Sequence, residues 1–228
     1  MKKTLLLFIF SLSINLAFAQ GLKFSIIAGL NSSTASQIPD YYMKRIAFAG
    51  ETFPNSHLVG FHFGAFAELP YKSVSFQTGV LYTTKGGIPY SSSETSDNPY
   101  SRKDMLRLDY LELPVNVLYH LPIGIGKFFI GGGPYIGVGI SGKQSYTIVD
   151  NTEYQNKAIK GNTNVTYGSD YNDIKTTDFG LGAQIGFVLK NGLLIRASYG
   201  YGLTNISNDP RYKGENKTLG LSLGYSFR

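Results

Sequence analysis

The chain has 228 residues, no cysteine and a formal net charge of +6, which fits one domain and excludes both a disulfide scaffold and a lipoprotein, whose lipid is carried by a cysteine. No Lys/Arg cluster suits a nucleic-acid surface, so we expect no nucleic-acid partner. After the N-terminal segment no stretch approaches the roughly 18 apolar residues of a membrane helix, so a membrane assignment must depend on strands.

The N-terminal segment is typical of a secretory signal peptide. Two lysines follow the first Met, residues 4–16 are mostly apolar, and an A-x-A cleavage site ends at Ala19, before Gln20. The alternative is an uncleaved anchor, which the short and partly polar stretch argues against. We therefore predict Sec-dependent export, with a signal peptide at 1–19 and a mature domain at 20–228.

Eight later runs alternate apolar residues with small or polar ones, which is the period of a β-strand. We expect strands at residues 22–31, 58–69, 73–85, 106–120, 128–141, 176–189, 193–203 and 218–227. One face of each run is so rich in Gly and Ser that the apolar face is expected to meet lipid. A run of about ten residues is the length that a tilted strand needs to cross a bilayer.

The connections between these runs are alternately short and long. The short ones are 70–72, 121–127 and 190–192, and the long ones are 32–57, 86–105, 142–175 and 204–217. In outer-membrane barrels short turns lie in the periplasm and long loops project outward. The pattern predicts an all-β fold, an eight-stranded antiparallel up-and-down transmembrane β-barrel in the outer membrane of a Gram-negative bacterium.

The predicted inner wall is rich in glycine, which leaves room in a narrow lumen for large residues such as Phe129, Tyr135 and Arg196. Charged and amide residues also point inward, namely Lys23, Glu68, Gln77, Lys85, Glu112, Asn116, Asp178, Gln184 and Arg196. They could form a transport pathway or a structural plug, and the plug is favoured because buried charges must be paired. The register predicts that one mixed ion network fills the lumen and blocks conduction, formed by Lys23, Glu68, Glu112 and Arg196.

Catalysis has one candidate, the inward His62, which a lipid-modifying barrel enzyme would need beside a Ser or a carboxylate. No motif surrounds it, so a hydrogen-bonded structural histidine is the favoured interpretation. His57 and His120 fall at a loop edge and a turn, and three scattered histidines do not form a metal site. We therefore expect no catalytic residue, no cofactor and no metal.

Tyrosines are frequent in the predicted loops, at Tyr41, Tyr42, Tyr90, Tyr100, Tyr146, Tyr154, Tyr167 and Tyr171. A tyrosine offers contact area and a hydroxyl, which suits protein or glycan partners. Ordinary loop packing or a membrane-rim position explains them equally well.

Three segments resemble the PorT-like outer-membrane β-barrel family: Tyr110–Pro114 (YLELP), Gly132–Gly137 (GGPYIG) and Gly202–Ile206 (GLTNI). The resemblance covers nearly all of the mature chain and identifies the barrel type rather than a task. It implies that one member serves secretion and gliding-type machinery, whereas most members have no assigned role. The chain departs from the usual barrel-assembly signal because Arg228 follows the terminal aromatic Phe227.

Together these features predict a non-enzymatic structural or interaction protein. Its expected partners are outer-membrane lipid, the barrel-assembly machinery during biogenesis, and proteins or glycans that contact the Tyr-rich loops. The alternatives are an accessory component of a secretion or gliding-type complex, a lipid-modifying enzyme and a narrow pore.

Overall fold

The computed structural model describes residues 21–35, 55–93, 100–150, 158–171, 173–209 and 214–227. The predicted cleavage site at Ala19 and Gln20, the loop residues Tyr41, Tyr42 and Tyr154, and the terminal Arg228 lie outside these ranges. No helix in the described part of the chain is long and apolar enough to cross a bilayer.

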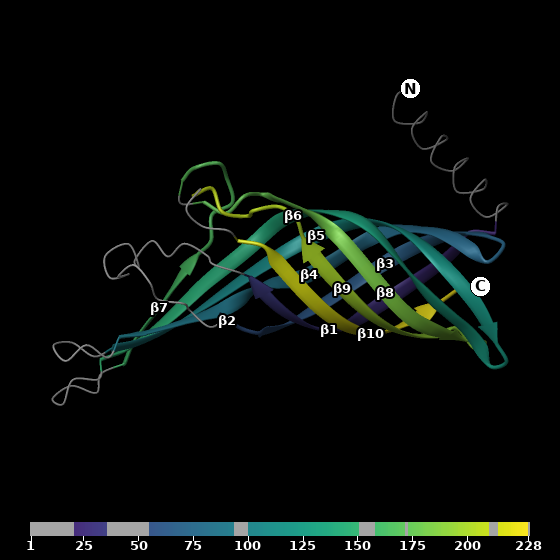
Figure 1. Cartoon of the computed structure of the whole chain (residues 1–228), viewed down its shortest axis with the longest axis horizontal. Coiled ribbons are helices and arrows are strands. Elements are labelled where there is room, and N and C mark those ends of the chain that lie inside the picture. Colours follow the sequence, from purple (N-terminus) through teal and green to yellow (C-terminus); the bar gives the residue numbers. More distant parts are fainter. Residues whose placement is uncertain are drawn as a thin grey trace, which may run out of the picture.

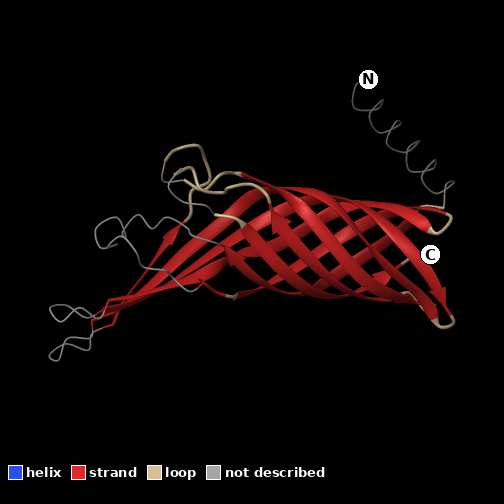
Figure 2. Cartoon of the chain, in the orientation of Figure 1, coloured by secondary structure: helices blue, strands red, loops and turns tan. Residues whose placement is uncertain are grey.

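Eight long strands close into an antiparallel barrel (Figures 1 and 2). They are β1 (Lys23–Ala35), β3 (Leu58–Tyr71), β4 (Val74–Ser93), β5 (Tyr100–Ile123), β6 (Gly126–Asp150), β8 (Thr177–Leu189), β9 (Leu193–Gly202) and β10 (Asn216–Ser226). The spatial order is β4-β3-β1-β10-β9-β8-β6-β5, and pairing of β5 with β4 completes the circle. Two short strands, β2 (Asn55–Ser56) and β7 (Ala158–Asn164), pair with β4 and β6. The eight-stranded barrel expected from the sequence is confirmed.

Three tight turns form one mouth of the barrel, which we call the short-turn mouth. They follow β3, β5 and β8, and Lys72 and Gly192 adopt φ angles of 56° and 93° there. Lys72 thus adopts a left-handed conformation that L-residues rarely occupy. The long connections lie at the opposite end, which we call the long-loop mouth (Figure 1).

Apolar side chains cover the outside of the barrel, and small or polar ones line its inside. Neighbouring positions on β10 illustrate the alternation, since Leu221 is 63% exposed and Ser222 is 1% exposed. The cross-strand register extends the outer row, because Leu221 pairs with Leu30 and Leu30 pairs with Phe61. An apolar belt that is half exposed on every strand is stable only against lipid, which places the barrel in a membrane.

The belt predicts a depth-dependent cost for adding charge. Val115, which is 49% exposed on β5, should lose about 2–4 kcal/mol of unfolding free energy when it is replaced by Arg, because the charge enters the hydrocarbon midplane. The same substitution at Val59, near the long-loop end of β3, should cost about 0–1 kcal/mol. Urea unfolding in lipid vesicles measures both, and equal costs would show that the two positions do not differ in depth.

β4, β5 and β6 are longer than the sequence suggested, at 20, 24 and 25 residues. The segments 86–105 and 142–175 were expected to be loops, and this is wrong for much of their length. Residues 86–93, 100–105 and 142–150 continue the barrel strands, and 158–164 form β7. Beyond the membrane both faces of a strand can meet water, so the ladder continues although the apolar alternation fades.

Candidate functional site: the lumen and its lid

A buried ion cluster crosses the lumen near its centre. The Lys85 ammonium on β4 lies 2.5 Å from Oε1 of Glu112 on β5 and 2.7 Å from Oδ2 of Asp178 on β8. Nδ2 of Asn216 also donates to Asp178, and Lys85 donates to the Tyr135 hydroxyl at 3.2 Å. The three charged side chains are less than a tenth exposed. Such buried charges are tolerated because each has a partner, and their contacts tie together strands that are not neighbours.

A chain of amides crosses the lumen beside this cluster. The side-chain amides of Asn116 and Gln184 both donate to Oε1 of Gln77, at 3.2 and 2.9 Å. Arg196 donates in turn to Oε1 of Gln184 at 3.2 Å, and its guanidinium lies 5.2 Å from the centre of the Phe66 ring. β4, β5, β8 and β9 are thereby connected across the bore by side chains of fixed orientation.

The four residues predicted to form one network are divided among three groups. Lys23 and Glu68 face each other in the β1–β3 register, as expected from the hairpin. The Glu68 carboxylate lies 3.1 Å from Nε2 of His120, which also hydrogen-bonds Ser75. Glu112 contacts Lys85, and Arg196 contacts Gln184. The sequence predicts that Lys85 and Asp178 face inward, and the structure adds that they form the centre of the ion cluster with Glu112.

His62 does lie beside an inward hydroxyl, because its Nε2 is 2.7 Å from Oγ of Ser222. Both side chains are buried and share one rung of the ladder with Gly29. No described carboxylate contacts the second nitrogen of His62, so the pair lacks an orienting acid. It borders a lumen cavity of about 80 Å³, which is also lined by Asn31, Glu112, Gln184 and Arg196.

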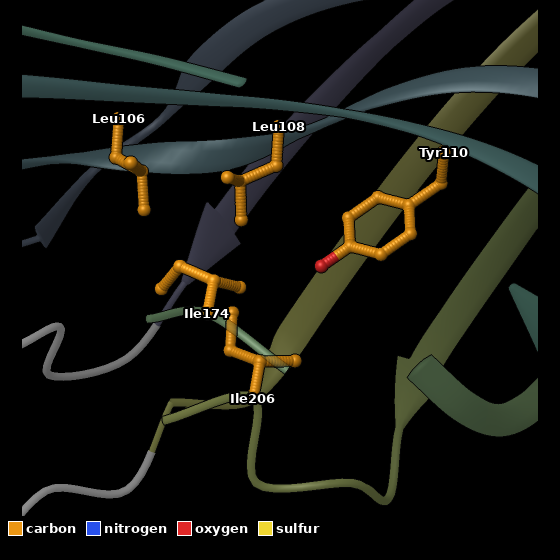
Figure 3. Close-up of a cluster of buried hydrophobic side chains, with 5 residues drawn as sticks. All are labelled: Leu106, Leu108, Tyr110, Ile174 and Ile206. Carbon is orange, nitrogen blue, oxygen red and sulfur yellow. The ribbon is translucent and has the colours of Figure 1, made fainter. Parts of the chain in front are cut away.

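An apolar cluster, which we call the lid, lies on the side of the long-loop mouth; Figure 3 shows its five side chains. Leu106, Leu108 and Tyr110 project inward from β5 and pack against Ile174 and Ile206 from two connecting segments. These five side chains are at most 6% exposed. Tyr110 is also 5.2 Å from the Lys85 ammonium, measured to its ring centre, so the lid lies directly against the ion cluster.

Polar contacts hold the two lid segments together. Nδ2 of Asn208 lies within hydrogen-bonding distance of the carbonyl oxygens of Gly168, Asp170 and Asp173. Tyr167 donates to the carbonyl oxygen of Ser141 at 2.9 Å, and burial raises the pKa of its phenol, so the hydroxyl remains a donor. The lid is therefore a folded part of the barrel.

A second apolar cluster narrows the lumen toward the short-turn mouth. Ile27, Phe66 and Leu194 are each at most 5% exposed, and Leu81 and Val188 pack against them. The lumen thus contains an apolar lid, a polar middle and an apolar floor in succession.

The predicted loop tyrosines occupy different environments. Tyr167 packs against the lid, with its ring centre 6.0 Å from that of Tyr110, whereas Tyr171 is 43% exposed. Tyr90, Tyr100 and Tyr146 belong to β4, β5 and β6 rather than to loops. The expected loop position is therefore wrong for these three tyrosines, because the strands continue past the barrel rim.

A family model described as "Outer membrane protein beta-barrel domain" matches residues 18–208. The attachment invasion locus protein Ail of Yersinia pestis is 14% identical, with 90% of this chain and 98% of that chain covered and a TM-score of 0.39. Neisserial surface protein A is 12% identical, with 91% of this chain and 97% of that chain covered and a TM-score of 0.36. OprG from Pseudomonas aeruginosa is 13% identical, with 90% of this chain and 96% of that chain covered and a TM-score of 0.35. No curated protein matches the chain. Because the identities and TM-scores of these solved structures are low, the assignment to a family depends on the family model alone.

Proposed function

The chain belongs to the outer membrane protein β-barrel domain family, and from this premise we propose that it is a sealed barrel that acts through its surface rather than as a pore or an enzyme. The protein is located in the outer membrane of a Gram-negative bacterium. The observation that supports a surface role is the filled lumen, in which the lid, the ion cluster and the floor follow one another.

Conduction is disfavoured by the same arrangement. A solute entering from the long-loop mouth would have to displace the lid and then break the contacts of Lys85 with Glu112 and Asp178. Removing one partner from a buried ion pair is costly because a charge is left uncompensated. The interior therefore supports a structural interpretation of the inward charges.

Enzymatic activity is disfavoured by the position of the His62–Ser222 pair and by the small size of the cavity beside it. Both residues face the lumen, while an acyl substrate in the membrane would meet the outer wall. The adjoining cavity of about 80 Å³ is also well below the several hundred Å³ of a typical ligand pocket. We assign the pair a structural role, in which it connects β3 with β10.

If the protein acts through its surface, its partners would contact the strands that extend past the barrel. We call this extension the protruding sheet; it comprises residues 86–93, 100–107, 142–150 and 158–164 (Figure 1). We propose that it faces the cell exterior, because the tight turns lie at the opposite mouth and short turns are periplasmic in this class of barrel. Protein, glycan or lipid partners would then be reached from outside.

The resemblance to PorT-like barrels suggests a second role, as an accessory component of a secretion or gliding-type complex. This hypothesis depends on the resemblance, and co-purification with periplasmic or outer-membrane machinery tests it.

Cysteine labelling tests the orientation, because the chain contains no cysteine of its own. We expect Asn162→Cys, on exposed β7, to react with a membrane-impermeant maleimide on intact cells. Asn191→Cys, in the exposed turn between β8 and β9, should react only after the cells are broken. The reverse pattern would place the protruding sheet in the periplasm and overturn the proposed surface role.

A further inference from the structure

The outward face of the protruding sheet carries a row of basic residues. Lys103 and Arg107 lie on β5, Lys143 on β6 and Lys160 on β7, and the three lysines are exposed. Among the described positions of this face, the acidic residue is Asp109, which lies at the end of the row nearest the barrel. Its Oδ1 lies 3.7 Å from Nε of Arg107. We refer to Lys103, Arg107, Lys143 and Lys160 as the basic face.

The strand register brings these cations close together. Arg107 and Lys143 are direct cross-strand partners, and Lys103 and Lys160 are both partners of Thr147, on its two sides. Strand spacing places Lys103 and Lys160 roughly 10 Å apart, and the two rungs are separated by roughly 13 Å. Like charges directly opposite each other destabilise a sheet. Asp109 offsets one of the four cations, so an anion bound above the Arg107–Lys143 pair would still stabilise it.

The basic face is continuous with the lipid-facing belt. Arg107 lies over the Phe61 ring, at 5.4 Å from its centre, and Phe61 stacks with Phe63 and Tyr82. Phe61 and Phe63 are 40% and 51% exposed on the outside of the barrel. Such aromatic side chains mark the membrane–water interface of a transmembrane barrel. The cations therefore begin where hydrocarbon gives way to lipid headgroups.

We infer that the basic face binds the phosphate groups of anionic lipid headgroups in the leaflet next to the protruding sheet. Charge complementarity and continuity with the apolar belt together favour a membrane lipid, whose acyl chains can lie on the belt while its phosphates contact the cations. The inference rests on the proposed surface role, which makes this leaflet the outer one, and on the exposed lysines.

Native mass spectrometry of the full mature barrel in detergent, titrated with bis-phosphorylated lipid A, tests the inference. Each Lys near an anionic lipid surface raises the binding affinity about fivefold. The triple variant Lys103→Gln, Lys143→Gln and Lys160→Gln should therefore bind lipid A about a hundredfold more weakly. The matched control is Lys72→Gln, Lys127→Gln and Lys190→Gln, which removes three exposed lysines near the short-turn mouth. It should retain the affinity of the unmodified barrel within about twofold.

Two further probes identify the source of the anion. Dephosphorylated lipid A should bind the unmodified barrel as weakly as bis-phosphorylated lipid A binds the triple variant. Inorganic phosphate at the same concentration should not displace the lipid. Displacement would point to a free phosphate site, and equal binding of the dephosphorylated lipid would point to sugar or acyl recognition; either result overturns the inference.

Folding of each variant is checked by its heat-dependent gel mobility. If the triple variant does not fold, Lys143→Gln alone removes the opposed pair and should weaken lipid binding about fivefold. Unchanged lipid binding in a folded triple variant would reject the basic face as the binding surface. Orientation is measured separately by the cysteine labelling, so a failed lipid test and a failed surface role remain distinguishable.

Discussion

Replacing Lys85 with Met is expected to lower the unfolding free energy of the barrel by about 3–5 kcal/mol. The substitution keeps the length of the side chain but leaves the carboxylates of Glu112 and Asp178 without their shared cation in the interior. The chain has no tryptophan, so unfolding in lipid vesicles is best followed by circular dichroism and by heat-dependent gel mobility. Lys190→Met, at an exposed turn residue, is the matched control and should change stability by less than about 0.5 kcal/mol.

A combined variant separates the loss of the ion cluster from the loss of packing. Adding Glu112→Gln and Asp178→Asn to Lys85→Met removes the stranded charges, so much of the lost stability should return. If the three costs add without recovery, Lys85 does not act through the two carboxylates.

Replacing Gly180 with Ala is expected to destabilise the barrel by about 1–3 kcal/mol through overpacking. A Cβ at this position would lie 2.5 Å from the Tyr135 hydroxyl and would also approach the backbone of Tyr201 too closely. Tyr135 accepts a hydrogen bond from Lys85, so its displacement would also disturb the ion cluster. The free energy of unfolding in vesicles measures the loss.

Gly182 provides a matched control two residues along the same face of β8. A Cβ there would be 3.8 Å from its nearest neighbour, the Gly133 carbonyl oxygen, which is ordinary contact. Gly182→Ala should therefore be neutral, or stabilising by about 0.4–1 kcal/mol, because alanine reduces the freedom of the unfolded chain. Equal destabilisation by both substitutions would mean that strand geometry, rather than space beside Tyr135, requires these glycines.

The sequence was most informative where lipid imposes a strict alternation. Leu219, Leu221 and Leu223 are 60–63% exposed and Ser222 is buried, as the period-two pattern predicts. The expectation that glycine makes room for large inward residues is confirmed as well, since Gly186 faces Phe129 and Gly180 faces Tyr135. Both features depend on local pattern or on neighbouring strands.

Contacts across the lumen were not accessible from the sequence. Lys85 and Asp178 are 93 positions apart and lie on strands that do not pair, so their proximity depends on how the whole barrel is staggered. The expected register did predict that Lys23 faces Glu68, because the two residues lie near the short-turn ends of consecutive antiparallel strands. The lid was missed for a similar reason, since Ile174 and Ile206 lie in irregular segments without a periodic signal.

Single-channel recording in planar bilayers tests the sealed barrel most directly. The unmodified protein, folded and inserted as shown by heat-dependent gel mobility, should give no conductance steps, because the lid and the ion cluster close the lumen. A stable, reproducible open conductance from the unmodified protein would contradict the account.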